Sequence, residues 1–266
     1  MKTLRISGFA VRGMVGESLT PNVVLDYASA FAAYADGGRI LVGRDTRFSS
    51  PMLDAAVKAG LLASGCDVID LGICPTPVLQ FLVKSQGAAG AVSISGGHNG
   101  MGWNAITLID SRGAWLDAVT GELILGLYHA RSFEQRDWQG QGTLSEPGEF
   151  FADYLDAMER CIRADAIRAA GFKVIVDPIG GAGTPYIQRF ADRLHLDLVP
   201  IHADPSGYLP REAEPRPRSA QHIASMIRYV DGHVGFVHSS DMGRTSLVAE
   251  DGEAASEEFT FAVVAE

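Results

Sequence analysis

The sequence has few cysteines and no long apolar run. Its 266 residues include only Cys66, Cys74 and Cys161, an odd number without the spacing of a metal site or a disulfide framework, so we expect buried free thiols. No stretch approaches the roughly 18 consecutive apolar residues of a membrane span. The first residues lead directly into a strand-like segment and lack a signal-peptide core. These absences predict a cytoplasmic protein without a membrane partner.

Positive charge is also scarce, because 22 lysines and arginines stand against 32 acidic residues and give a net charge of −10. This balance argues against nucleic acid or an anionic membrane surface as the main partner. Any anionic ligand would need a local basic pocket. The composition is otherwise that of a globular protein, with 47% hydrophobic and 20% charged residues. The length predicts two domains of roughly 100–150 residues each.

The first half alternates strand and helix patterns. Short apolar runs typical of buried strands occupy residues 39–43, 67–71 and 89–94. Residues 21–34 and 50–64 have the apolar spacing of helices, and Pro51 suits a first helical turn. Strands that alternate with helices indicate a largely parallel sheet with helical crossovers.

A polar, glycine-rich stretch at residues 138–147 predicts a domain boundary, which gives domains of residues 1–147 and 148–266. A second α/β unit is expected after it. Its predicted elements are a helix over 149–169, a strand over 173–177, a glycine turn at 180–183 followed by a helix, a strand over 196–200, a loop over 205–218, a helix over 220–229 and a last strand over 234–237. The loop contains four prolines, which exclude long regular structure.

Several loops together resemble one known family. They are residues 7–13 (SGFAVRG), 42–50 (VGRDTRFSS), 71–77 (LGICPTP), 180–183 (GGAG) and the proline-rich loop that ends at Glu214 and Pro215. In order and spacing they are similar to loops of the α-D-phosphohexomutases, the phosphoglucomutase/phosphomannomutase family. The resemblance covers nearly the whole chain and corresponds to the first two of the family's four domains. It implies two three-layer α/β/α domains with mixed, mainly parallel sheets.

The resemblance also implies carbohydrate metabolism and intramolecular phosphotransfer, an isomerase reaction. In the family, one domain carries a phosphoserine loop and the second carries a magnesium loop. The third domain reads the sugar, and the fourth holds the substrate phosphate. This chain matches only the first two, and phosphoryl transfer depends mainly on positioning and charge stabilisation. A site enclosed by only two of the four domains would lower the rate of phosphoryl transfer by orders of magnitude.

The phosphoserine loop departs from the family pattern. The family reads T-A-S-H-N-P where this chain has residues 95–100 (SGGHNG), so Gly97 stands at the serine position. Glycine has no oxygen to phosphorylate. Ser95, at the family's threonine position, is an alternative nucleophile. The family's N-G-x-K corresponds to residues 104–107 (NAIT), which places Thr107 at the lysine position, and a threonine hydroxyl does not titrate near neutral pH. We therefore expect no catalytic residue.

The magnesium loop is similarly changed. The family's D-G-D-A-D-R corresponds to residues 239–244 (SSDMGR), so Asp241 and Arg244 remain while Ser239 and Gly243 replace two aspartates. Magnesium prefers several oxygen ligands in an octahedral arrangement, so we expect neither useful magnesium affinity nor another cofactor. Asp241 is the single candidate metal ligand. Its alternative roles are an ion pair with Arg244 or the capping of a turn.

Four polar residues of the matched loops remain as candidate ligands for a phosphate or sugar phosphate: Arg12, His98, Asn99 and Arg244. Two arginines and the free amides of a glycine-rich loop can receive an anion. His98 has an alternative structural role as a hydrogen-bonding residue. We expect the Gly97 and Asp241 loops to face one cleft.

Three functions stay open at this point. The first is a pseudoenzyme of the phosphohexomutase family that binds a sugar phosphate or a protein partner. The second is an active mutase whose remaining domains are missing from this chain, and it is favoured by residues 262–266, which look like an unfinished helix. The third is a structural or partner-binding α/β module, with the surface left by the absent domains as its interface.

Overall fold

The computed structural model describes residues 3–255, 259, 262 and 263. By their contacts these residues form two compact units. Residues 3–96 and 101–150 group into the first, and residues 97–100 and the described residues from 151 onward group into the second. Of the helix expected over residues 262–266, the last three lie outside the described residues. Among the described helices, none combines the length and the apolar character that crossing a bilayer requires.

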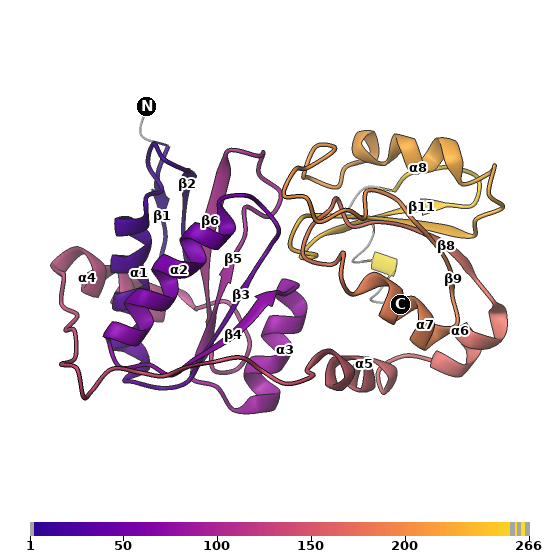
Figure 1. Cartoon of the computed structure of the whole chain (residues 1–266). Coiled ribbons are helices and arrows are strands. Elements are labelled where there is room, and N and C mark those ends of the chain that lie inside the picture. The colour runs from indigo at the N-terminus through magenta and orange to yellow at the C-terminus, as the bar shows by residue number, and fades with distance from the viewer. Residues whose placement is uncertain (1–2, 256–258, 260–261, 264–266) are drawn as a thin grey trace. The chain divides into compact units, whose positions relative to one another are not determined.

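The first unit is built on a seven-stranded mixed sheet with the order β1-β2-β6-β5-β3-β4-β7. Strands β3, β4, β5 and β7 are parallel where they pair, whereas β1, β2 and β6 join antiparallel. Its elements are β1 (Arg5–Ile6), β2 (Ala10–Met14), α1 (Pro21–Ala35), β3 (Ile40–Arg44), α2 (Ser50–Ala63), β4 (Val68–Ile73), α3 (Thr76–Gln86), β5 (Gly90–Ile94), β6 (Trp103–Asp110), α4 (Ala118–Ala130) and β7 (Leu144–Ser145) (Figure 1).

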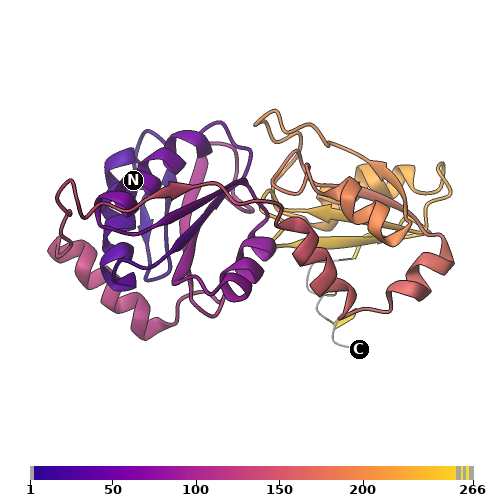
Figure 2. The ribbon, with the colours of Figure 1, turned by 60° about the horizontal axis from the view of Figure 1, so that its bottom comes forward.

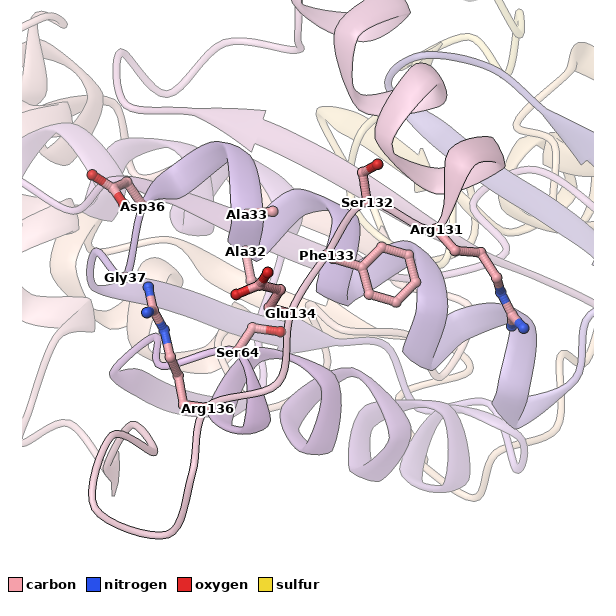
Figure 3. A pocket seen from close by; sticks show the side chains of 10 residues that line it. All are labelled: Ala32, Ala33, Asp36, Gly37, Ser64, Arg131, Ser132, Phe133, Glu134 and Arg136. Atoms are coloured by element: carbon pink, nitrogen blue, oxygen red, sulfur yellow. The ribbon is translucent and has the colours of Figure 1, made fainter.

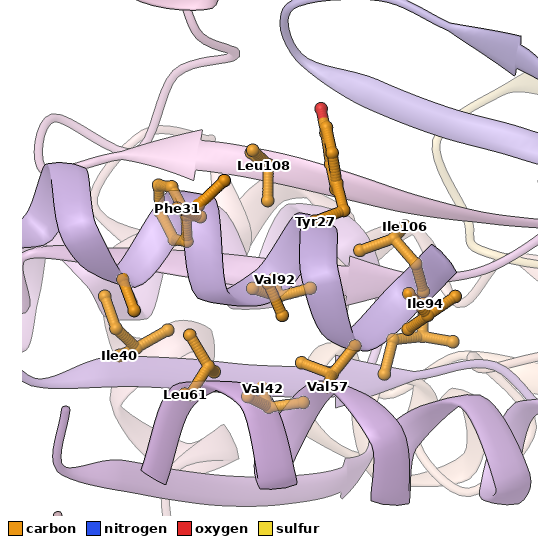
Figure 4. Close-up of a cluster of buried hydrophobic side chains, with 14 of the residues drawn as sticks. Tyr27, Phe31, Ile40, Val42, Val57, Leu61, Val92, Ile94, Ile106 and Leu108 are labelled. Carbon is orange, nitrogen blue, oxygen red and sulfur yellow. The ribbon is translucent and has the colours of Figure 1, made fainter. Parts of the chain in front are cut away.

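Helices lie on both faces of this sheet. Alternate strand residues such as Val42, Val92 and Ile106 are fully buried in one cluster with α1 and α2 (Figure 4). The intervening residues face the other side, where a side chain at Gly43 would touch Leu79 of α3. Because side chains alternate along a strand, the two faces form two separate cores. The predicted α/β class, with helices on both sides of a mixed sheet, is confirmed here.

The second unit carries a four-stranded sheet with the order β11-β10-β8-β9. Strands β8, β9 and β10 are parallel, and β11 pairs antiparallel with β10. Ile223 and Ile227 pack on Ile175, Val237 and Val248 of the sheet. The elements are α5 (Phe151–Glu159), α6 (Ala164–Ala170), β8 (Lys173–Asp177), α7 (Ile187–Leu194), β9 (Asp197–Pro200), a 3₁₀ turn (Pro217–Ala220), α8 (Gln221–Met226), β10 (Val234–His238) and β11 (Thr245–Ala249).

The single helix expected over residues 149–169 is wrong. The chain forms α5 and α6 with a turn between them (Figure 2). Arg168 and Arg193 both pair with Glu159, the latter at 2.8 Å. In one continuous helix Arg168 would lie nine residues beyond Glu159, which is half a turn away around the axis and about 13 Å along it. The break therefore permits this group of ion pairs.

Three other expectations also fail. The strand β10 is not the last one, because β11 returns beside it across the tight turn at residues 239–244. The helix expected over residues 220–229 is shorter, and α8 ends at Met226. Cys66 and Cys74 are free and buried as expected, but Cys161 is exposed in the turn after α5. These deviations come from turns, for which apolar spacing carries little signal.

Candidate functional site

The loop at the family's phosphoserine position follows β5 and leads into β6. Gly97 has a φ of +53°, in the left-handed region that glycine enters without a steric cost. His98 and Asn99 follow in the same turn and are half-buried. Gly97 therefore lacks a nucleophilic side chain, and it also lets the loop adopt a left-handed backbone conformation. A serine at this position would be strained by about 1 kcal/mol.

Ser95 is held in a buried polar network centred on Asp45. The Ser95 hydroxyl donates to Asp45 Oδ2 at 2.7 Å, and Ser50 donates to Asp45 Oδ1 at 2.6 Å. Arg47 donates to the same carboxylate through its backbone amide and through Nε, both at 3.0 Å. Asp45 and Arg47 are each only 1% exposed. Loss of any contact in so deeply buried an ion pair would leave polar atoms without hydrogen-bond partners. The network therefore holds the start of the loop in one conformation.

Two further contacts extend this network. Asn104 of β6 donates to the hydroxyls of Ser49 and Ser50 at 2.9 and 3.0 Å. A Cβ at Gly96 would lie 2.5 Å from Cζ of Arg47, so only glycine fits where the loop passes the guanidinium. Residues 42–50 are recognisable from the sequence as a family motif, but the motif by itself gives them no role in the site. The sequence feature that could have indicated this network is the high density of polar residues directly after an apolar strand.

Arg12 and Thr107 lie on one face of the sheet. Ala10 is the cross-strand partner of Thr107, and Arg12 is the partner of Ala105. Because directly opposed residues share a face and alternate residues return to it, Arg12 and Thr107 are diagonal neighbours on adjacent strands. Thr107 thus occupies a position near an arginine but offers only a hydroxyl.

The loop at the family's magnesium position is a tight turn between β10 and β11. Asp241 Oδ1 accepts from the Ser239 hydroxyl at 2.7 Å and from the Gly243 amide at 3.1 Å. The Ser239 hydroxyl in turn accepts from the Arg244 amide at 3.0 Å. Asp241 therefore caps its own turn, one of the two roles expected for it. A Cβ at Gly243 would lie 3.0 Å from Asp241 Oδ2.

Arg244 forms an ion pair with Glu214 of the proline-rich loop, with 3.0 Å between Nη1 and Oε1. Glu214 also pairs with Arg216 at 2.6 Å. The expected partner of Arg244 was Asp241, and this part of the prediction is wrong because the chain folds the proline-rich loop against the turn. Met242, at a position where the family has alanine, has a φ of +62° and packs on Gly183.

The predicted site residues thus fall into two groups. Arg12, Ser95 and Thr107 belong to the first unit. Residues 97–100, which include His98 and Asn99, group with the second unit, as do Ser239, Asp241, Gly243 and Arg244. Within each unit the residues lie together as the motifs indicate. The Gly97 loop and the Asp241 turn lie together within the second unit, because the Ser240 hydroxyl donates to the Gly97 carbonyl at 3.0 Å and a Cβ at Gly97 would lie 3.9 Å from Asp241 Oδ2. Whether Arg12 shares a cleft with these loops stays a prediction.

A separate concavity of about 440 Å³ lies in the first unit, at the carboxyl ends of α1, α2 and α4. Ser64, Phe133 and Glu134 gather at its centre, with Arg131 and Arg136 at its two ends (Figure 3). Arg131 forms an ion pair with Asp26. None of the predicted site residues lines this pocket, so it is distinct from the loops of the resemblance.

Comparison with protein families identifies two matching domains. Residues 7–135 match phosphoglucomutase/phosphomannomutase, alpha/beta/alpha domain I, and residues 152–252 match domain II of the same family. A probable phosphoglucosamine mutase of Pyrococcus abyssi is 34% identical over 96% of this chain and 55% of its own length. A phosphoglucomutase/phosphomannomutase of Thermococcus kodakarensis is 32% identical over 97% of this chain and 58% of its own length.

Solved structures show the same fold. A putative phosphomannomutase from Thermus thermophilus superposes with a TM-score of 0.84 at 22% identity, over 95% of this chain and 58% of that one. A phosphoglucomutase/phosphomannomutase family protein from Burkholderia thailandensis gives 0.77 at 25% identity, over 94% and 56%. The chain spans little more than half the length of these relatives. Both matched domains, in the order found here, place this chain in the phosphoglucomutase/phosphomannomutase family.

Proposed function

We propose that this protein binds a phosphorylated hexose through the loops of the phosphohexomutase family and does not catalyse the serine-dependent mutase reaction. The observation that carries the proposal is Gly97, because a double-displacement mutase must store a phosphate on the enzyme between its two transfers. Without a side-chain oxygen at this position no phosphate can be stored. The expected ligands of the sugar phosphate are Arg12, His98, Asn99 and Arg244.

The surroundings of Ser95 support this proposal. Ser95 is 8% exposed, and its hydroxyl donates to the Asp45 carboxylate. Both oxygens of the Asp45 carboxylate are also engaged by hydrogen bonds from Arg47 and Ser50, so this carboxylate is part of the network that holds the loop. A nucleophile also needs access to the phosphoryl group and a base that can take its proton. Ser95 fits a structural role better than that of a relocated nucleophile.

The donor atoms of the 239–244 turn do not fit the magnesium ion of the family. Ser239 contributes a hydroxyl, Gly243 contributes no side-chain oxygen, and Asp241 Oδ1 is already engaged by two hydrogen bonds within the turn. Magnesium requires near-octahedral oxygen coordination and is usually anchored by carboxylates. We therefore assign no catalytic step to a metal at this turn. Calorimetry with millimolar magnesium is expected to give no saturable heat that depends on Asp241.

The second candidate function is an active mutase completed by further domains. It is favoured by the comparisons, since relatives 30–34% identical over 96% of this chain carry the name phosphoglucosamine mutase. This candidate requires a nucleophile other than residue 97. It also requires that the activity appear only in a longer form of the protein.

The deciding assay couples formation of glucose 6-phosphate from glucose 1-phosphate to a dehydrogenase, with the longest natural form of the chain and a sugar bisphosphate activator. We expect no turnover, and none in Gly97→Ser, because Thr107, Ser239 and Gly243 still leave the phosphoryl group without its lysine and its metal. Turnover that survives purification and disappears in Ser95→Ala would establish the active mutase instead.

Binding is measured separately by calorimetry with glucose 1-phosphate. Arg12→Gln should weaken binding at least tenfold, since a charged hydrogen bond contributes about 1.5–3 kcal/mol. Arg39→Gln is the matched control because Arg39 is exposed at the opposite, amino-terminal end of β3. Equal affinities in the two variants would exclude Arg12 from the site.

A further inference from the structure

A cluster of titratable side chains in the second unit lies outside the loops discussed so far. Asp177 ends β8, His202 follows β9, and His222 is the second residue of α8. Oδ2 of Asp177 lies 2.8 Å from His202 Nδ1 and 2.5 Å from His222 Nε2. These three atoms all lie within 4.8 Å of one another. Three elements distant in sequence therefore converge on one carboxylate oxygen.

The three side chains of the cluster differ in their exposure to solvent. The side chain of Asp177 is fully buried, whereas those of His202 and His222 are each 30% exposed. The imidazole rings are 5.1 Å apart and tilted by 49°. Two imidazoles and one carboxylate are the donor types that zinc, cobalt and nickel ions prefer, and three protein ligands with one open side leave room for water as the fourth ligand.

The backbone around the carboxylate is strained. Ile179 has a φ of +58° and His202 has a φ of +49°, conformations that are costly for residues with a Cβ, above all for a β-branched one. The Ile179 amide donates to Asp177 Oδ1 at 2.7 Å, and the Gly180 amide donates to the His202 carbonyl at 2.5 Å. Such strain concentrates at functional sites, where the surrounding structure maintains it.

Arg211 is the competing cation in this cluster. Its Nε donates to Asp177 Oδ2 at 2.8 Å. Its other donors bind the backbone carbonyls of Glu212, Asp177 and His238 at 2.9, 3.2 and 2.7 Å. These hydrogen bonds to carbonyl oxygens hold the guanidinium in place without the carboxylate. A metal ion can therefore replace Arg211 Nε at Asp177 Oδ2 while Arg211 keeps its position. A nearby positive charge nevertheless opposes a second cation.

We propose that Asp177, His202 and His222 form a binding site for a divalent transition-metal ion of the zinc class, with Asp177 Oδ2, His202 Nδ1 and His222 Nε2 as its ligands. A metal ion needs the lone pair of each nitrogen, so any proton that His202 Nδ1 or His222 Nε2 carries moves to the other ring nitrogen or leaves to solvent on binding. Ligands about 2.0 Å from a tetrahedral zinc ion lie roughly 3.3 Å apart. The nitrogens now lie 2.8 and 2.5 Å from Asp177 Oδ2, so they must move away from it by about 0.5 and 0.8 Å. Small rotations of two partly exposed imidazoles can provide this.

The site differs from the turn at residues 239–244 in its chemistry. Two of its three donors are imidazole nitrogens, which suit zinc and not magnesium. The proposal does not depend on the proposed sugar-phosphate function, because none of its ligands belongs to that set. Its failure would leave the proposed function untouched.

The test uses the untagged full chain, stripped with a chelator and titrated with Co²⁺ and Zn²⁺. We expect one equivalent of Co²⁺ to bind with the strong visible absorption of a four- or five-coordinate site, and Zn²⁺ to displace it. His202→Ala and His222→Ala should each weaken binding by at least about tenfold. His195→Asn is the matched control, since His195 is an exposed histidine of the same unit in a left-handed conformation that asparagine tolerates.

The variant Arg211→Gln provides an independent test of the metal site. Removing the competing charge should tighten Co²⁺ binding several-fold if the cluster is a metal site. In a purely structural ion-pair network the same variant would lower the melting temperature and leave Co²⁺ binding at the level of the double variant His202→Ala/His222→Ala. Circular dichroism establishes that each variant is folded. Wild-type protein that binds no more Co²⁺ than this double variant would overturn the proposal.

Discussion

His238 offers a sharp test of how burial controls charge in the second unit. It ends β10 with its ring stacked on Phe236, with 6.4 Å between centroids and planes within 6°. Its Nδ1 is buried, and among the described residues it has no hydrogen-bond partner. Burial of the ring, together with the positive charge of Arg211, lowers the pKa of His238 to about 4 from its ordinary 6.5. The imidazole is therefore neutral in the folded protein near neutral pH.

The direction of the pH effect follows from proton binding. Between pH 6.5 and about 4 the unfolded chain takes up a proton at His238 that the folded chain does not. The stabilisation is therefore fully present above the unfolded pKa and is lost as the pH falls through this window. Lowering this pKa from 6.5 to about 4 corresponds to roughly 3 kcal/mol, which is an upper bound because the residue is only half-buried.

The perturbation is His238→Phe, which keeps the stacked ring and removes the titration. We expect the variant to be more stable than wild type by about 1 kcal/mol near neutral pH, because a buried nitrogen without a partner is removed. Its advantage should grow by up to about 3 kcal/mol as the pH falls toward about 4. Urea unfolding followed by circular dichroism at a series of pH values, with a chelator present, measures both quantities.

The control is His195→Asn, which removes an exposed histidine of the same unit and places asparagine in a left-handed conformation that it tolerates. Taking the difference between variant and wild type cancels other groups that titrate in the same range. One of these is Asp177: burial alone would raise its pKa, but hydrogen bonds from His222, Arg211 and His202 hold that pKa well below its ordinary value. If the His238→Phe difference does not change with pH, the assigned burial of this imidazole is wrong.

Other substitutions test the packing of the first unit. Gly60→Ala should destabilise the protein by about 1–3 kcal/mol in thermal unfolding, because the new Cβ would lie 2.7 Å from the Leu25 carbonyl oxygen where α2 crosses α1. Gly126→Ala in α4 has open space and should instead stabilise by up to about 1 kcal/mol, so equal effects at the two glycines would refute the close approach. Arg47→Met leaves the buried Asp45 charge without its partner, and we expect urea unfolding to show a loss of about 3–5 kcal/mol. A loss below about 1 kcal/mol would mean that the pair is solvated.

Much of the molecule could be predicted from local sequence. The apolar runs near residues 40, 68 and 90 become parallel strands, and the helices that begin at Pro21 and Ser50 lie where their spacing and prolines indicate. These elements are dictated by side-chain periodicity and by the fixed φ of proline, which act over a few residues. The family motifs were readable for the same reason, because each loop is a contiguous stretch of sequence. They also identified Gly97 as the substitution that removes the nucleophile.

Tertiary structure decided what lies between these elements. The break between α5 and α6 lets Glu159 form ion pairs with arginines up to 34 positions away, and no local pattern encodes these pairs. Arg244 pairs with Glu214 rather than with the aspartate three residues before it, because the proline-rich loop folds against the turn. Asp177, His202 and His222 converge only because β8, β9 and α8 meet at one end of a sheet. Long-range electrostatic and metal-binding arrangements depend on distances in space, and a single sequence specifies those distances only through the completed fold.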